Sequence, residues 1–368
     1  MMAVAAALAF AVVAAVSWLA VGMAQPVASP TAGRLAALPS PSAAPSTTAA
    51  SPAPSPSIAV TPSPSPSATP RTTPRPMPHA AGAPTVNPAA LLAARPWLAW
   101  RPSGAGRVAF YNLPAPWIGG PATDDVAVYL PPGYDRSPGR RYPVLYEAPT
   151  PYSFWEGETG ARFTLDALID EGAIPASIVV FVDSGSGPYS DLQCANTYDG
   201  REWLDTFIGQ TVVGWVDAHF RTIAAAPARA VFGMSNGGYC AAILGLHHPT
   251  VFGAEISFSG YYQVTAVAAA EIPFGYEAAL MAAASPLDAA GMLSASERSG
   301  IFFLLVADPY QSFYASQASA FAAVLARDGY PHSVLWTGIP HGWSQVNAEF
   351  ARTLELVAAR EVATGVFR

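Results

Sequence analysis

A serine between glycines is the strongest sign of chemistry in this sequence. Ser235 is the central residue of Gly233-Met234-Ser235-Asn236-Gly237, after a short apolar run and before a helix-like segment. A serine hydroxyl is a weak nucleophile, which a tight strand-to-helix turn can project toward a general base. The flanking glycines permit such a turn, and the helix N-terminus offers N–H groups and partial positive charge to an oxyanion. The motif therefore predicts Ser235 as a catalytic nucleophile.

The general base has to come from six histidines. His341 follows the last strand-like segment and precedes the last helix-like one, so we expect it at the carboxyl edge of a parallel sheet, where Ser235 is also expected. The other five histidines have structural explanations, because they lie in the Pro-rich segment, at the end of a predicted helix or at the start of a predicted strand. They are His79, His219, His247, His248 and His332. His341 is therefore the predicted base.

An acid that orients the base should come between nucleophile and base along the chain. Asp308 directly follows the apolar run 301–307, which predicts a carboxylate at the tip of a strand. An Asp-Pro pair that initiates a turn explains the same residue without catalysis. Asp308 is the first choice for the acid, and Asp288, in an Ala-rich segment, is the second.

The oxyanion needs two hydrogen-bond donors. One is the backbone N–H of Asn236, the residue after the nucleophile. The other should come from the loop that follows the third predicted strand, where Pro149 and Pro151 have no N–H to offer. Ala148 and Thr150 are the remaining candidates for this second donor.

Three aromatic side chains near these residues are candidates for a substrate pocket. Tyr152 and Trp155 follow the proposed oxyanion loop, and Trp343 lies two residues after the base. Core packing explains Tyr152 and Trp155 equally well, so no substrate is inferred from them.

The elements that must position these residues alternate along the chain. Short apolar runs, typical of strands buried on both faces, occupy residues 108–112, 126–130, 143–147, 178–183, 230–234, 254–257, 301–307 and 332–337. Helices are predicted at 161–171, 202–219, 237–247, 313–327 and 345–360, and residues 261–300 suggest a helical cap.

This alternation predicts the α/β class. We expect a mostly parallel sheet of about eight strands, with helices on both faces. The first strands have no helix between them, so they are expected to be antiparallel.

The N-terminal quarter has a different character from the rest of the chain. Residues 1–24 are an apolar segment of about the length that crosses a bilayer, and they end in small residues that a signal peptidase could recognise. We interpret them as a signal peptide or an N-terminal membrane anchor. Residues 25–88 are rich in Pro, Ser, Thr and Ala and read as a disordered linker, before one domain at 89–368. The expected location is extracytoplasmic, secreted or anchored by the N-terminal segment, which alone would contact the membrane.

Charge and cysteine content narrow the function further. No acid precedes Asp124, and the residues from there on carry 12 Arg against 25 Asp and Glu, a net charge of −13. A surface this acidic is unsuited to nucleic acid. Cys194 and Cys240 have no metal-ligand spacing, so no metal is expected. They could form a disulfide in an oxidising compartment, or Cys240 could be a small apolar residue of a buried helix.

Several segments together resemble one family, the esterase-D-like α/β-hydrolases. This group includes feruloyl esterases, enterochelin esterases, S-formylglutathione hydrolases and trehalose mycolyltransferases. The resemblance lies, in family order, at residues 128–134, 142–146, 215–220, 233–238, 248–253, 257–260 and 341–343. It implies the α/β-hydrolase fold, no cofactor, and a triad of Ser235, Asp308 and His341.

Two departures from the family pattern stand out. Relatives carry a His-Gly or Asp-Gly pair where this chain has Glu147 and Ala148, which affects the second oxyanion donor. The usual Glu-Leu-x-Pro of a helix is replaced by residues 211–214, TVVG.

The sequence thus predicts an exported, monomeric serine esterase or acyltransferase that forms an acyl-enzyme. Its substrate would be a small-molecule, glycan or lipid ester. The alternative is a non-catalytic, exported carbohydrate- or cell-wall-binding protein on the same fold.

Overall fold

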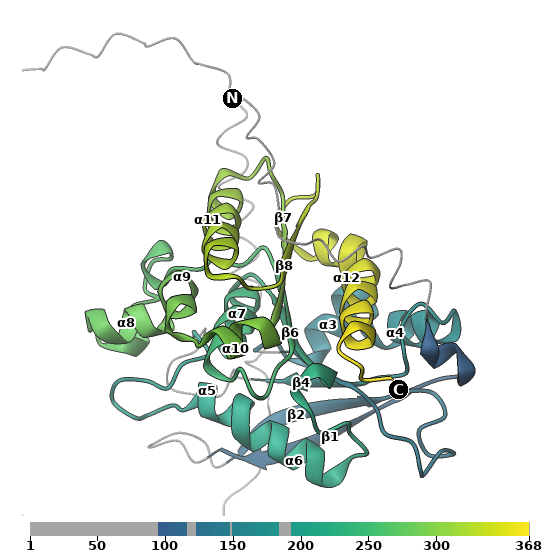
Figure 1. The fold of residues 1–368 in the computed structure, drawn as a ribbon. Coiled ribbons are helices and arrows are strands. Elements are labelled where there is room, and N and C mark those ends of the chain that lie inside the picture. The colour runs from purple at the N-terminus through teal and green to yellow at the C-terminus, as the bar shows by residue number, and fades with distance from the viewer. Residues whose placement is uncertain (1–94, 116–122, 148, 184–192, 368) are drawn as a thin grey trace, which may run out of the picture. The chain divides into compact units, whose positions relative to one another are not determined.

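A single eight-stranded sheet organises the residues that the computed structural model describes, namely 95–115, 123–147, 149–183 and 193–367 (Figure 1). Its strand order is β1-β2-β4-β3-β5-β6-β7-β8. The strands are β1 (Arg107–Pro114), β2 (Thr123–Leu130), β3 (Val144–Glu147), β4 (Ile178–Val182), β5 (Arg229–Met234), β6 (Ala254–Phe258), β7 (Phe302–Ala307) and β8 (His332–Trp336). The segments interpreted as signal or anchor and as linker lie outside the described residues.

The sheet has the predicted strand directions. β1 pairs antiparallel with β2, and β2 antiparallel with β4, whereas every pairing from β4 through β3 to β8 is parallel. The central strands β3, β4 and β6 are buried along their whole length, as a sheet covered on both faces requires. The predicted fold class and all eight predicted strands are confirmed.

Helices cover both faces of the sheet. In Figure 1, α3 (Tyr152–Thr159), α4 (Ala161–Asp170) and α12 (Trp343–Ala363) lie on one side, and α7 (Asn236–His247) and α11 (Ser312–Asp328) lie on the other. Four of these match predicted helices, but α3 was not predicted. No helix among the described residues combines the length and the apolar character that a membrane crossing requires.

The helix predicted at 202–219 is present but not regular. It consists of α5 (Leu204–Thr206), a π-helical stretch η2 (Phe207–Val212) and α6 (Val213–His219). A Cβ on Gly209 would lie only 2.3 Å from the His248 ring. The absence of a side chain at this position therefore allows the His248 imidazole to pack directly against the helix.

The cap, residues 261–300, is helical as expected. It contains α8 (Ala278–Ala284), α9 (Pro286–Ala289) and α10 (Ala295–Gly300). Two short 3-10 turns precede α8, and a third lies between α9 and α10. The Tyr239 hydroxyl donates to the carbonyl of Ala284 over 2.6 Å. This hydrogen bond, from α7 to the end of α8, joins the cap to the helix that follows the nucleophile.

A buried carboxyl in α12 makes stability depend on pH. Burial raises the pKa of Glu361 from 4.5 to about 8. The folded state therefore holds a proton that the unfolded state has released, so this stabilisation is complete below pH 4.5 and lost as the pH rises toward 8. We expect Glu361→Gln to make the decline of the unfolding free energy shallower by up to about 1.4 kcal/mol per pH unit.

Urea titrations of the wild type and the variant, at intervals between pH 5 and 8, measure this slope. Glu355→Gln is the matched control, because Glu355 lies on the same helix but is partly exposed. Equal slopes for the wild type and Glu361→Gln would contradict the prediction.

Candidate active site

Ser235 occupies a sharp turn between β5 and α7. Its backbone has φ 60° and ψ −114°, a conformation that non-glycine residues adopt rarely. Its N–H donates to the carbonyl of Phe258 at the tip of β6, over 2.8 Å. A Cβ on Gly233 would lie 2.5 Å from the backbone of Gly237, so a side chain there would prevent the turn. The glycines of the motif thus have the steric role expected of them.

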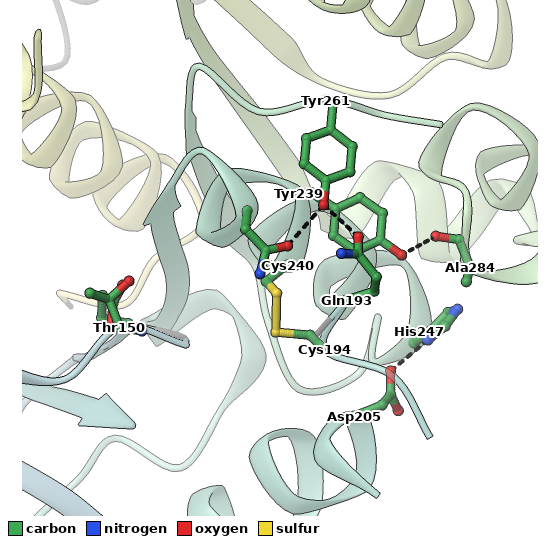
Figure 2. The surroundings of a disulfide bond; sticks show 11 residues. Thr150, Gln193, Cys194, Asp205, Tyr239, Cys240, His247, Tyr261 and Ala284 are labelled. Atoms are coloured by element: carbon green, nitrogen blue, oxygen red, sulfur yellow. Dashed lines mark hydrogen bonds and ion pairs between the residues drawn. A yellow bond between two sulfur atoms is a disulfide. The ribbon is translucent and has the colours of Figure 1, made fainter. Parts of the chain in front are cut away.

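The residue after the nucleophile, Asn236, is held by a polar network, of which Figure 2 labels Gln193, Tyr239 and Tyr261. The side chain of Asn236 is hydrogen-bonded to the Tyr261 hydroxyl over 2.9 Å, and this hydroxyl is also hydrogen-bonded to Gln193. The Tyr261 ring stacks on Tyr239, with centroids 4.9 Å apart and planes 12° from parallel. Asn236 is the predicted source of the first oxyanion donor, and these contacts fix its position at the start of α7.

A disulfide joins Cys194 to Cys240, with 5.3 Å between the Cα atoms. Both cysteines are buried, and Figure 2 shows the bond next to Gln193 and Tyr261. It therefore attaches the segment that carries Gln193 to α7, beside the Asn236 network. The bond closes a chain separation of 46 residues, for which loop entropy corresponds to about 4 kcal/mol. Of the two alternatives for these cysteines, the structure contains the disulfide.

Two glutamines hold the loop that carries His341. The Oε1 atom of Gln311 accepts the backbone N–H of His341 over 2.6 Å. The amide of Gln345, which is fully buried, donates to the carbonyl of Ile339 over 2.9 Å and accepts from the Ser259 hydroxyl over 2.7 Å. These bonds join the base loop to α12, to the residue that follows β6 and to the residue that precedes α11. Neither glutamine was predicted as a site residue.

The imidazole of His341 lies flat against the ring of Tyr314. The centroids are 4.5 Å apart and the planes are within 7° of parallel. The Nε2 atom of His341 has no hydrogen-bond partner in the part of the chain that the structure describes. Burial lowers the pKa of His341. A neutral imidazole with an unpaired nitrogen is what a general base requires.

Tyr314 lies in the first turn of α11 and is half-buried. Burial raises the pKa of Tyr314. The phenol therefore stays protonated at neutral pH, next to the imidazole on which its ring stacks.

Asp308 lies at the tip of β7, where the sequence predicted it. Its side chain is 3% exposed, and its Oδ1 atom accepts the N–H of Tyr310 over 3.0 Å. Within the described ranges, no hydrogen bond joins Asp308 to His341 or His341 to Ser235. Gln311 connects the other two elements of the predicted triad, because its backbone N–H donates to the Asp308 carbonyl over 3.2 Å and its Oε1 atom accepts the N–H of His341. Asp288, the second choice, lies in α9 and accepts from Gln263.

The loop after β3 differs from what an oxyanion hole requires. Glu147 is fully buried, and its Oε2 atom accepts the N–H of Thr150 over 3.1 Å. Burial raises the pKa of Glu147 well above its usual value. A carboxyl group removed from water needs a hydrogen-bond donor. The N–H of Thr150 fills this role for Glu147, so it is already engaged and was one of the two candidates for the second oxyanion donor. Ala148, the other candidate, lies outside the described residues.

The three aromatic candidates for a substrate pocket have different surroundings. Trp155 is 0% exposed and makes edge contacts with Phe232 and with Trp343, at 5.0 and 5.1 Å between centroids. The core-packing alternative therefore holds for Trp155. The hydroxyl of Tyr152 donates to Glu156 and its ring packs against Phe181 on β4. Trp343 is partly exposed.

A second polar cluster lies at the other end of α7. Asp205 accepts from His247 Nδ1 over 2.6 Å and from His248 Nε2 over 2.8 Å. Although burial opposes it, these bonds lower the pKa of Asp205 to about 2. His247 Nε2 also bonds the carbonyl of Ala283 in the cap. Among the described residues, no three His, Cys, Asp or Glu side chains form a group that could hold a metal ion, and we interpret this cluster as structural.

Comparison with known proteins identifies similar chains. The family described as "Putative esterase" matches residues 123–359. An esterase of Mycobacterium tuberculosis (strain ATCC 25618 / H37Rv) is 35% identical over 138 residues, which is 37% of this chain and 28% of that esterase. The aligned region thus spans little more than a quarter of this curated relative.

Two solved structures show the same fold. A ferulic acid esterase aligns with a TM-score of 0.60 and 17% identity, over 70% of this chain and 99% of its own. An S-formylglutathione hydrolase from Agrobacterium tumefaciens aligns with a TM-score of 0.56 and 14% identity, over 70% of this chain and 96% of its own. At such low identity, these likenesses establish the architecture and not the substrate.

Proposed function

Because this chain belongs to the putative esterase family, as the motif resemblance predicted, we propose that it cleaves a carboxylic ester through an acyl-enzyme on Ser235. His341 is the general base and Asp308 the acid that orients it. The observation that carries the proposal is the strained turn that places Ser235 at the start of α7, in the family's nucleophile motif. The buried Nε2 atom of His341, which has no hydrogen-bond partner among the described residues, supports the assignment of the base.

The chemistry follows from these positions. The Ser235 hydroxyl gives its proton to Nε2 of His341 while its oxygen bonds to the ester carbonyl carbon. The carbonyl oxygen becomes an oxyanion that accepts from the Asn236 N–H at the start of α7. Collapse of this intermediate breaks the ester C–O bond, and the imidazolium protonates the leaving alcohol. Water or a second hydroxyl compound, activated by the same imidazole, then takes the acyl group from Ser235.

Among the described residues, the Nε2 atom of His341 has no hydrogen-bond partner. The reaction therefore needs the Ser235 hydroxyl and the imidazole of His341 to come into hydrogen-bonding contact. Catalytic hydrogen bonds commonly tighten only when substrate is present.

Substrate and location are also part of the proposal. We propose a small-molecule, glycan or lipid ester as the substrate class, and a monomer that works outside the cytoplasm. The apolar segment 1–24 supports export. The buried disulfide supports it too, because such bonds persist in oxidising compartments.

A fluorophosphonate probe tests the proposed function directly. We expect one label per folded chain, on the peptide that contains Ser235, and none on heat-denatured protein. Ester hydrolysis measured with short-acyl, long-acyl and feruloyl substrates, with and without a sugar acceptor, would then separate a hydrolase from an acyltransferase. Absence of both labelling and ester turnover would favour the carbohydrate- or cell-wall-binding alternative, for which the engaged Thr150 N–H is the structural argument.

A further inference from the structure

We propose that Ser259 and Gln345 are a pair of positioning residues, which fix the loop that carries His341 relative to the turn that carries Ser235. The inference rests on the proposed ester chemistry. It gives a catalytic purpose to two residues to which neither the motifs nor the family resemblance assigned a role.

Gln345 lies in the first turn of α12 and is fully buried. Its Nε2 atom donates to the carbonyl of Ile339 over 2.9 Å and to the Thr337 hydroxyl over 3.3 Å, and its Oε1 atom accepts from the Ser259 hydroxyl over 2.7 Å. These partners all lie outside α12. A buried polar network whose members are satisfied makes its surroundings rigid. Because Ile339 is two residues before His341, the amide restrains the base loop.

Ser259 connects this network to the other two parts of the triad. It directly follows Phe258, whose carbonyl accepts the N–H of Ser235 over 2.8 Å. The N–H of Ser259 donates over 2.7 Å to the carbonyl of Val306, two residues before Asp308. Its hydroxyl makes the bond to the buried amide. One serine, 1% exposed, therefore links the nucleophile turn, the strand of the acid and the base loop.

The backbone of Ser259 gives independent support. Its φ is 45°, in the left-handed region that residues other than glycine seldom adopt. Strain of this kind persists only where the surroundings hold it, and it is concentrated at functional sites. Glycine would accept the same φ without strain, but it would not supply the hydroxyl that Gln345 accepts.

The pair acts through His341 and not on the substrate. Proton transfer requires the imidazole to come into contact with the Ser235 hydroxyl, and an error of about 1 Å in such an alignment can lower a rate about 100-fold. A loop held at Ile339 confines the necessary movement to the side chain of His341. Ser259 and Gln345 therefore set the alignment and take no part in any covalent or proton-transfer step.

Ser259→Ala removes the hydroxyl and leaves the backbone hydrogen bonds of this position in place. We expect kcat to fall about 30-fold with KM changed less than about threefold, because the alignment of the base is lost and substrate binding is not. Ser285→Ala is the matched control. Ser285 is also a buried serine, whose hydroxyl donates to Met281 and accepts the N–H of Val264 in the cap, so this variant should lose stability and keep kcat.

The pH profile gives a readout that a general loss of stability would not change. Burial lowers the pKa of His341. A base loop that is no longer restrained exposes the imidazole, so the acid limb of kcat/KM should move up toward the usual histidine pKa in Ser259→Ala. The acid limb of Ser285→Ala should stay where it is in the wild type.

Ser259→Gly separates the hydroxyl from the strain. Glycine adopts a positive φ more readily than alanine, so the melting temperature of this variant should exceed that of Ser259→Ala. Its kcat should nevertheless fall as far, because both variants lack the hydroxyl.

Gln345→Leu completes a double-variant cycle. Since the two residues act as a pair, Ser259→Ala combined with Gln345→Leu should be scarcely slower than Gln345→Leu alone. If Gln345→Leu does not fold, the alanine and glycine variants of Ser259 decide the question. Wild-type kcat and acid limb in these two variants would overturn the inference and leave the proposed function intact. If the wild type takes no fluorophosphonate label and turns over no ester, the proposed function fails and this inference fails with it.

Discussion

Ser235→Ala is expected to lower kcat/KM by about 10⁶-fold and to abolish fluorophosphonate labelling. The hydroxyl oxygen is the atom that forms the acyl bond, and no other serine occupies a strained strand-to-helix turn next to the base loop in the part of the chain described. The measurement is initial rates with a chromogenic ester, together with intact mass after probe treatment. A melting curve shows whether the variant is folded, since alanine faces the same positive φ as serine.

The combination with His341→Ala gives the decisive control. Nucleophile and base act as one unit, so the double variant should be scarcely slower than Ser235→Ala alone. Additive losses would mean that the two residues act independently. A Ser235→Ala protein that keeps more than about a tenth of the wild-type rate would contradict the assignment of the nucleophile.

The strands could be predicted because their residues are mostly of apolar types, which indicate burial. β4 is buried along its full length, and all five of its residues are apolar. A run of this kind is not stable when exposed to water. It can therefore be assigned to a buried strand without knowing which other strands it pairs with. Differences between the predicted and observed strands are confined to the ends.

Helix α3 shows where local pattern fails. Its eight residues contain a single buried side chain, Trp155, and no apolar stripe. The helix is set by tertiary contacts, because the indole packs against Phe232 and Trp343 from other elements. The π-helical stretch also has a contact of this kind, because the His248 ring packs against Gly209. Contacts between segments distant along the chain are invisible to periodicity.

The residues of the candidate site also fall into those that the sequence predicted and those that only the fold reveals. Ser235, His341 and Asp308 could be proposed because their chemistry restricts residue type and chain order. Gln311, Gln345 and Tyr314 are ordinary residues of two helices and one loop. Only the fold shows that the two glutamines hold the base loop and that the Tyr314 ring stacks on His341. The engagement of the Thr150 N–H depends on the burial of Glu147, which the sequence marked only as a departure from the family pattern.

The second large effect is expected from Asp308→Asn, which should lower kcat about 10⁴-fold with little change in stability. A carboxylate is needed to stabilise the imidazolium that forms when His341 takes the serine proton, and a neutral amide cannot do this. Asparagine retains an oxygen for the N–H of Tyr310, so the turn after β7 should survive. Steady-state kinetics and a melting curve measure the two properties separately.

This prediction separates two roles for one buried side chain. Among the described residues, the Asp308 carboxylate is hydrogen-bonded only within its own turn, to the N–H of Tyr310. A purely structural acid would tolerate asparagine. Asp288→Asn is the matched control, since Asp288 lies in α9 with Gln263 as its partner and should lose no more than about twofold. A loss below about tenfold in Asp308→Asn would assign the residue to the turn. A large loss would mean that the carboxylate reaches His341 during catalysis, after a movement of the imidazole away from its stack on Tyr314.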